Sequence, residues 1–75
     1  MTRQSTDRFS VTTYNKYDGL EIAASNVSRE EAWAVAQEQQ TAGTNPAPYV
    51  ANYPTVVMVR ENGIFGATVW TWKKA

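Results

Sequence analysis

The chain has 75 residues, with seven basic and seven acidic side chains and neither cysteine nor histidine. Its length allows a single domain, and its composition excludes disulfides, thiolate metal sites and histidine-based catalysis. A formal net charge of zero argues against a polyanionic partner, because binding to a polyanion depends on clustered Lys and Arg.

The size of the chain also limits its stability. A single core in a chain this short rarely contributes more than about 3–5 kcal/mol. Small proteins supplement such a core with a disulfide, a metal ion or a partner subunit. Since cysteine and histidine are missing, no disulfide, thiolate site or histidine ligand can supply it, and self-association is the best remaining candidate.

The first segment, residues 1–7, is polar and without periodicity, which predicts a flexible tail ahead of one domain over residues 8–75. It lacks the apolar stretch of a signal peptide, so none is predicted. No apolar run approaches the length needed to cross a bilayer. The expected location is therefore the cytoplasm, with no membrane partner.

Two strands are predicted next. β-Branched and aromatic residues alternate with polar ones over residues 8–14, and apolar residues alternate again over residues 20–25. Between them, Asp18-Gly19 is a strong turn dipeptide because glycine accepts a positive φ. These residues predict a β-hairpin.

A helix is predicted from Arg29 to Ala42. Ser28 and Glu31 have the spacing of a capping box, in which each side chain satisfies a backbone amide of the other residue. Gly43 is placed to end the helix in the left-handed conformation. The alanines of the helix favour a close approach to a sheet.

Residues 44–54 contain three prolines, which exclude a regular helix or a central strand. This segment is predicted to be a crossover loop that carries Tyr49 and Tyr53. We expect the loop to be ordered only if these tyrosines pack against the rest of the domain.

A second hairpin is predicted at the end of the chain. Its strands cover residues 55–61 and 64–72, joined by the two-residue turn Asn62-Gly63. That turn places Val59 opposite Gly66 and makes both faces of the hairpin apolar. One helix covers about one face of a four-stranded sheet, so the other face needs the proline loop or a second copy of the protein.

These elements predict an α+β fold of order ββαββ, in which two β-hairpins flank one helix and form a mainly antiparallel four-stranded sheet packed on it. The order of the strands within the sheet stays open, as does the face that the helix covers.

The candidate interface begins with four residues that share one face of the last hairpin: Val57, Val59, Trp70 and Trp72. They form either core under the helix or an aromatic surface for a partner, since large aromatic residues are common interface anchors. If the helix covers this face, the opposite face becomes the candidate.

Four tyrosines complete the candidate interface: Tyr14, Tyr17, Tyr49 and Tyr53. The first two lie near the tip of the first hairpin and the others lie in the proline loop. Exposed tyrosine is typical of adaptable contact surfaces. The alternative is that these rings cover the end of the core.

No residue is assigned to catalysis, to a cofactor or to a metal. Glu30 and Glu31 are explained by the start of the helix and Asp18 by its turn. No base is available to activate a serine, and no glycine-rich phosphate loop occurs. A small enzyme or ligand carrier would need a closed pocket with at least two buried carboxylates.

The ββαββ order, the Ser-x-x-Glu-Ala helix start at residues 28–32 and the final Asn-Gly hairpin resemble many small bacterial and phage proteins. The resemblance implies an accessory protein, including one that inhibits a host system by occupying a surface. The function expected is a non-enzymatic protein–protein interaction module that forms a homodimer. The alternative is a binder of single-stranded nucleic acid that uses sheet aromatics.

Overall fold

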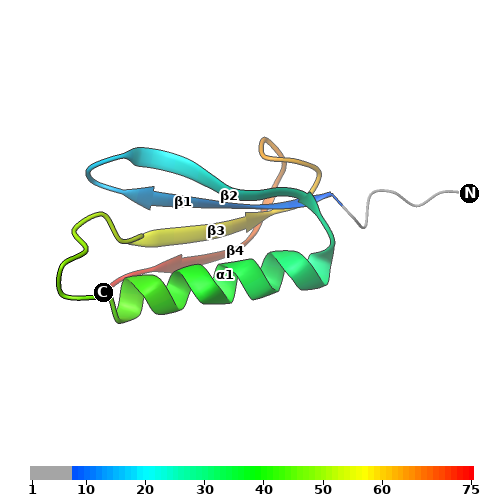
Figure 1. The fold of residues 1–75 in the computed structure, drawn as a ribbon. Helices are drawn as coiled ribbons and strands as arrows, with labels where there is room; N and C mark the ends of the chain where they lie inside the picture. Colours follow the sequence, from blue (N-terminus) through cyan, green and yellow to red (C-terminus); the bar gives the residue numbers. More distant parts are fainter. Residues whose placement is uncertain (1–7) are drawn as a thin grey trace, which may run out of the picture.

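The computed structural model describes residues 8–75, which form a four-stranded sheet with one helix against it (Figure 1). The elements are β1 (Phe9–Asn15), β2 (Gly19–Val27), α1 (Arg29–Thr44), β3 (Val56–Arg60) and β4 (Thr68–Lys73). The predicted α+β fold of order ββαββ is confirmed. The tail predicted for residues 1–7 lies outside the described residues.

The strand order in the sheet is β2-β1-β3-β4, and every neighbouring pair is antiparallel. The two hairpins therefore lie side by side, with β1 and β3 in the centre and β2 and β4 at the edges. Tyr14 is the one exposed residue of β1, as expected for a central strand. The connection from β2 to β3 runs through α1 and crosses one face of the sheet (Figure 1).

The turn between β1 and β2 is stabilised by a side chain. Asn15 Oδ1 accepts hydrogen bonds from the backbone amides of Tyr17, at 2.9 Å, and Asp18, at 2.7 Å. Gly19 then adopts a φ of 77°, which is the reason for a glycine at this position. The predicted turn is confirmed, and the asparagine holds it closed.

The helix begins where its cap predicts. Ser28 Oγ accepts a hydrogen bond from the Glu31 amide at 3.2 Å, and the Ser28 carbonyl accepts one from the Ala32 amide at 2.9 Å. The helix continues to Thr44, past the predicted end at Ala42.

Gly43 does not end the helix, so that prediction is wrong. The cap is Asn45, with a φ of −127°, and Gly43 is buried within the last turn. A Cβ atom at Gly43 would overlap the Pro54 carbonyl oxygen and lie 2.9 Å from the Trp72 ring. The glycine is needed for close packing of helix on sheet and not for a left-handed conformation.

The core lies between α1 and the sheet. Its buried apolar residues are Phe9, Val11, Ala32, Ala36, Val57 and Val59. Trp33 extends this core from the helix and packs edge-on against Phe9, with ring centroids 5.8 Å apart. Two of the six buried apolar residues are alanines, so the fully buried core contains little side-chain volume.

The last hairpin differs from the prediction in its register. Val59 pairs with Trp70, not with Gly66, and β4 begins only at Thr68. Asn62 and Gly63 have the positive φ values that a two-residue turn requires, but the Gly63 amide donates a hydrogen bond to the Arg8 carbonyl at 2.9 Å.

That bond ties residues 61–67 to the start of β1 and makes them a wide loop, closed by a hydrogen bond from the Glu61 amide to the Ala67 carbonyl at 3.0 Å. The register moves by four residues from Gly66 to Trp70. Because four is even, Trp70 and Trp72 keep their predicted face, whereas Thr68, beyond an irregularity at Val69, pairs with Arg60 on the opposite face.

The proline loop between α1 and β3 is fastened to the first hairpin. The Thr55 amide donates to the Tyr14 carbonyl at 2.8 Å, and Asn52 Nδ2 donates to Asp18 Oδ2 at 3.0 Å. Tyr53 is half-buried, with Lys74 Nζ 4.8 Å from the centre of its ring. Its neighbour Tyr49 is exposed to solvent.

Candidate functional site

The helix covers the sheet face that carries the four hairpin residues of the candidate interface. Val57 and Val59 are fully buried beneath α1. Trp70 and Trp72, their partners on β4, are half-buried and pack against the same core. All four residues therefore lie in or beside the core, as in the first of the two interpretations given for them. The sheet face opposite the helix becomes the candidate interface.

That opposite face, here called the open face, follows from the pairing of the strands. Across one row lie Leu20, Tyr14, Val56 and Lys73, and across the next lie Ile22, Thr12, Met58 and Thr71. Side chains of a strand alternate between faces, so residues of these rows point away from α1. Three of the four side chains in the first row and two of the four in the second are apolar.

The apolar residues of these two rows form the open patch: Tyr14, Leu20, Ile22, Val56 and Met58. Leu20 is 63% exposed, Ile22 is 56% exposed and Tyr14 is 42% exposed. Contiguous exposed apolar surface of this kind marks interaction sites in small proteins. The open patch therefore differs from an ordinary solvated sheet face, which normally carries polar residues.

One end of the open face is covered by the loop of residues 61–67. Ser10 and Thr12 point to the open face but are only 0% and 3% exposed. A groove of about 330 Å³ separates the loop from β2, and Ile22 and Phe65 are among the residues that line it. The loop therefore stands above the open face at the end where β1 begins.

Phe65 lies on this loop and is 93% exposed, the most exposed large apolar side chain among the described residues. The loop that holds it is braced, because Arg60 Nη1 donates to the Gly66 carbonyl at 3.3 Å and the Gly66 amide donates to the Gly63 carbonyl at 3.1 Å. An aromatic ring held at the rim of an apolar patch suits the role of an interface anchor.

The charges on the open face have one sign. Lys73 pairs with Val56 in the first row. Arg60 pairs with Ser10 in a third row, next to the row of Thr12 and Met58. Both cations therefore belong to the open face. The strands contribute no carboxylate to it, since Glu21 pairs with Thr13 and lies on the helix side. Arg60 also places Nη2 3.7 Å from the sulfur of Met58.

Three buried polar atoms within the described residues lack a hydrogen-bond partner: Ser10 Oγ, Thr12 Oγ1 and Arg60 Nε. All three belong to residues of the open face. They lie under the covered end of it, beside the loop of residues 61–67. Hydrogen-bonding groups without a partner therefore lie on the same side of the sheet as the open patch.

The four predicted tyrosines do not come together. Tyr14 lies in the open patch, whereas Tyr17 is exposed in the β1–β2 turn with Lys16 Nζ 5.5 Å from its ring centre. Tyr49 and Tyr53 belong to the proline loop. Sequence reasoning missed Leu20 and Ile22 as candidates, although their alternation on β2 was the signal that could have identified them.

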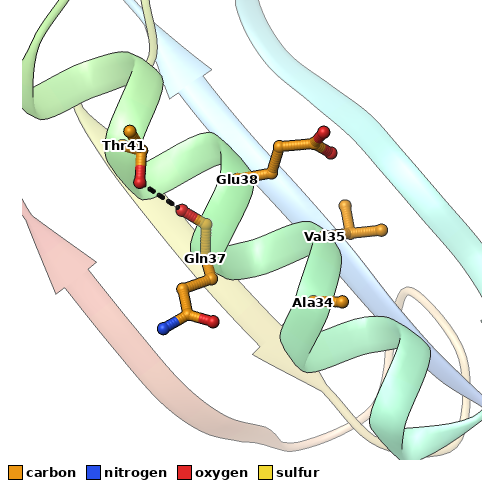
Figure 2. Close-up of a pocket in the computed structure, with 5 residues that line it drawn as sticks. All are labelled: Ala34, Val35, Gln37, Glu38 and Thr41. Carbon is orange, nitrogen blue, oxygen red and sulfur yellow. Dashed lines mark hydrogen bonds between the residues drawn. The ribbon is translucent and has the colours of Figure 1, made fainter.

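Other hollows are less suited to be the site. The outer surface of α1 has a shallow depression lined by Ala34, Val35, Gln37, Glu38 and Thr41. Figure 2 shows that these side chains diverge along a convex helix, and the hydrogen bond drawn there, from Thr41 Oγ1 to the Gln37 carbonyl at 3.0 Å, lies within the helix. This depression has no group of converging polar atoms.

A second hollow lies between α1 and β4. It has a volume of about 230 Å³ and is lined by Trp33, Ala36, Gln37, Gln40 and Trp70. Its lining contains no charged side chain. Within residues 8–75, no three acidic side chains are placed together to hold a metal ion, and no helix is long and apolar enough to cross a membrane.

Comparison with other proteins adds no relative. No family model, curated protein or solved structure matches the chain. The open face is therefore the feature of the molecule that bears on function.

Proposed function

We propose that this protein is a non-enzymatic protein–protein interaction module that forms a homodimer through its open face. The observation that carries the proposal is the open patch, which leaves Leu20 and Ile22 more than half exposed beside Tyr14. Burial of apolar surface contributes roughly 25 cal/mol per Å². An association that buries these exposed side chains is therefore favoured.

The small core supports a second copy as the partner. The side chains buried on the helix side include two alanines and three valines, so a large part of the apolar surface of the chain lies on the other side of the sheet. A dimer that covers that surface forms only from folded chains. Dimer formation would therefore shift the folding equilibrium toward the native state.

A non-enzymatic role is supported by the chemistry of the hollows. Two of the hollows are lined by one carboxylate each, Glu38 in one and Glu30 in the other. The groove beside Phe65 and the hollow beside Trp70 are lined by no carboxylate. The closed pocket with two buried carboxylates that would favour an enzyme or ligand carrier has no counterpart among them. An accessory or inhibitory role would use the same open patch.

The proposal is tested by sedimentation velocity at micromolar concentrations. We expect the wild-type chain to sediment as a dimer and the Ile22→Lys variant to sediment as a monomer, because a lysine there would bury an unpaired cation within the open patch. The matched control is Ala34→Lys on the exposed outer surface of α1, which should leave the dimer unchanged. A wild-type monomer at these concentrations would refute self-association.

A second candidate function follows from the charges. Tyr14 and Phe65 lie on a side of the sheet to which the strands contribute two cations and no carboxylate, as in sheet surfaces that stack single-stranded bases. Trp70 packs against the helix and would not take part. Fluorescence anisotropy of a labelled oligothymidine at low salt tests this function, and unchanged anisotropy at high protein concentration would end it.

A further inference from the structure

We infer that the groove between β2 and the loop of residues 61–67 binds an extended acidic segment of a partner protein, with a carboxylate of the segment on Arg8 and its apolar side chains on Ile22 and the open patch. This inference rests on the proposed role as an interaction module and adds a partner other than a second copy. It is carried by the position of one cation in a groove with apolar walls.

The walls of the groove are already in place. Its volume of about 330 Å³ falls within the range of ligand sites in proteins. Ile22 lines it from β2 and is 56% exposed, and Phe65 lines it from the loop and is 93% exposed. The loop is fastened to the start of β1, because the Gly63 amide donates a hydrogen bond to the Arg8 carbonyl at 2.9 Å. A ligand therefore does not have to order the loop when it binds.

The charge of the groove selects an acidic ligand. Among the described residues that line it, Arg8 is the one that carries a charge. The strands add Lys73 and Arg60 to the same face of the sheet and no carboxylate. A guanidinium binds a carboxylate with two parallel hydrogen bonds. The same cations repel a basic segment, so charge complementarity favours an acidic one.

The spacing between the cation and the apolar side chains defines the pattern of the segment. Arg8 precedes Thr12 by four residues, and Thr12 pairs with Ile22. Four residues of extended chain span about 13 Å. Leu20 and Tyr14 form the next row of the open face. An extended segment along β2 therefore needs an acidic residue, a bulky apolar residue four positions away and a second apolar residue two positions beyond that.

Asparagine side chains on both sides of the groove suit the backbone of such a segment. Asn26 of β2 has a φ of 55° and Asn62 of the loop has a φ of 64°, and within residues 8–75 no other residue except glycine has a positive φ. Both side chains line the groove and are exposed. An asparagine amide offers an acceptor and two donors, which match the amide and carbonyl groups of a peptide backbone.

The size of the site fits a short segment better than a folded partner. A stable interface between two folded proteins buries about 1,200–2,000 Å². The loop stands above one end of the open face, so it obstructs a flat partner there. An extended segment of about seven residues has the derived pattern and lies beside the loop without displacing it.

Fluorescence anisotropy of a labelled synthetic peptide tests the inference. The probe is Glu-Ser-Thr-Ser-Leu-Thr-Phe with both ends blocked, which has the acidic and apolar residues at the derived spacing. We expect saturable binding to the wild-type chain. Arg8→Gln should weaken it severalfold, as for an exposed charge pair, and Phe65→Ala should weaken it about tenfold, as for an aromatic anchor. Both side chains are exposed, so neither substitution should disturb folding.

Matched controls remove the same kinds of side chain elsewhere. Arg29→Gln on α1 and Tyr49→Ala in the proline loop change exposed residues that do not line the groove, and they should leave binding of the peptide unchanged. Charge reversal is the sharper test. Arg8→Glu should lose the peptide and bind instead the peptide in which lysine replaces glutamate.

Several outcomes would overturn the inference. These are no binding of the peptide at about 1 mM, equal binding by the wild-type chain and Arg8→Gln, or equal binding of the glutamate and lysine peptides by the wild-type chain. Binding of a labelled oligothymidine that Arg8→Gln weakens, with no binding of the peptide, would assign the groove to nucleic acid and overturn the inference as well.

Sedimentation velocity of the same samples separates this inference from the proposed self-association. A wild-type dimer that binds no peptide would overturn the inference alone. A wild-type monomer that binds the peptide in an Arg8-dependent way would support the inference and refute self-association alone. A monomer that binds no peptide would refute both.

Discussion

Gly43 controls how closely the helix approaches the sheet. It is buried in the last turn of α1, where the Pro54 carbonyl and the Trp72 ring occupy the space that a side chain would need. Glycine inside a helix costs about 1 kcal/mol relative to alanine. That cost is offset here because the absent Cβ lets the end of the helix pack directly on β4.

We expect Gly43→Ala to destabilise the protein despite the better helix propensity of alanine. Overpacking a filled site costs about 1–3 kcal/mol, which exceeds the propensity gain. Urea denaturation followed by tryptophan fluorescence would measure the free energy of unfolding. Ala42→Gly, at the exposed neighbouring position, calibrates propensity alone. A more stable Gly43→Ala variant would contradict the close contact with Pro54.

At the scale of elements, α1 depends on its first turn. Its carboxylates Glu30 and Glu31 lie at the positive end of the helix dipole, and no basic residue lies in its last turn. The Ser28 side chain satisfies one of the amides that the helix leaves without an internal partner. The end of α1 is held by distant residues instead, because Lys74 Nζ donates a hydrogen bond to the Gly43 carbonyl at 2.6 Å.

Ser28→Ala should lower the free energy of unfolding by about 1 kcal/mol, because it removes the acceptor of the Glu31 amide. Thermal unfolding followed by circular dichroism would detect the change. Ser25→Ala on β2, at an exposed position, serves as the control for loss of a hydroxyl. Equal effects of the two substitutions would argue against a capping role.

At the scale of the whole molecule, the two faces of the sheet differ in what covers them. One face buries Val57 and Val59 under α1, and the other leaves Leu20 and Ile22 exposed. A second copy would bury that surface in the native state only. Association would therefore couple the stability of the chain to its concentration.

We expect the melting temperature of the wild-type chain to rise as protein concentration increases from low to high micromolar. Ile22→Lys should melt at a temperature that does not depend on concentration, because it removes association. Differential scanning calorimetry over a dilution series measures both. A concentration-independent melting temperature for the wild-type chain would mean that its folded state is stable as a monomer.

The sequence alone determined the elements of this protein and their order. Ser28 and Glu31 predict where the helix begins, Asp18-Gly19 predicts the first turn, and alternation predicts which residues of a strand share a face. These features depend on neighbours a few residues apart, so they can be read locally. Even the wrong register of the last hairpin kept Trp70 on its predicted face.

The tertiary structure decided what depends on distant contacts. The Gly63 amide bonds to Arg8, which widens the last loop and moves the register, and Gly43 meets Pro54 and Trp72 instead of ending the helix. The choice of the face that α1 covers, and hence the position of the candidate site, follows from the path of the chain from β2 to β3. Both faces of the last hairpin are apolar, so no local pattern could distinguish them; only the packing of the helix did.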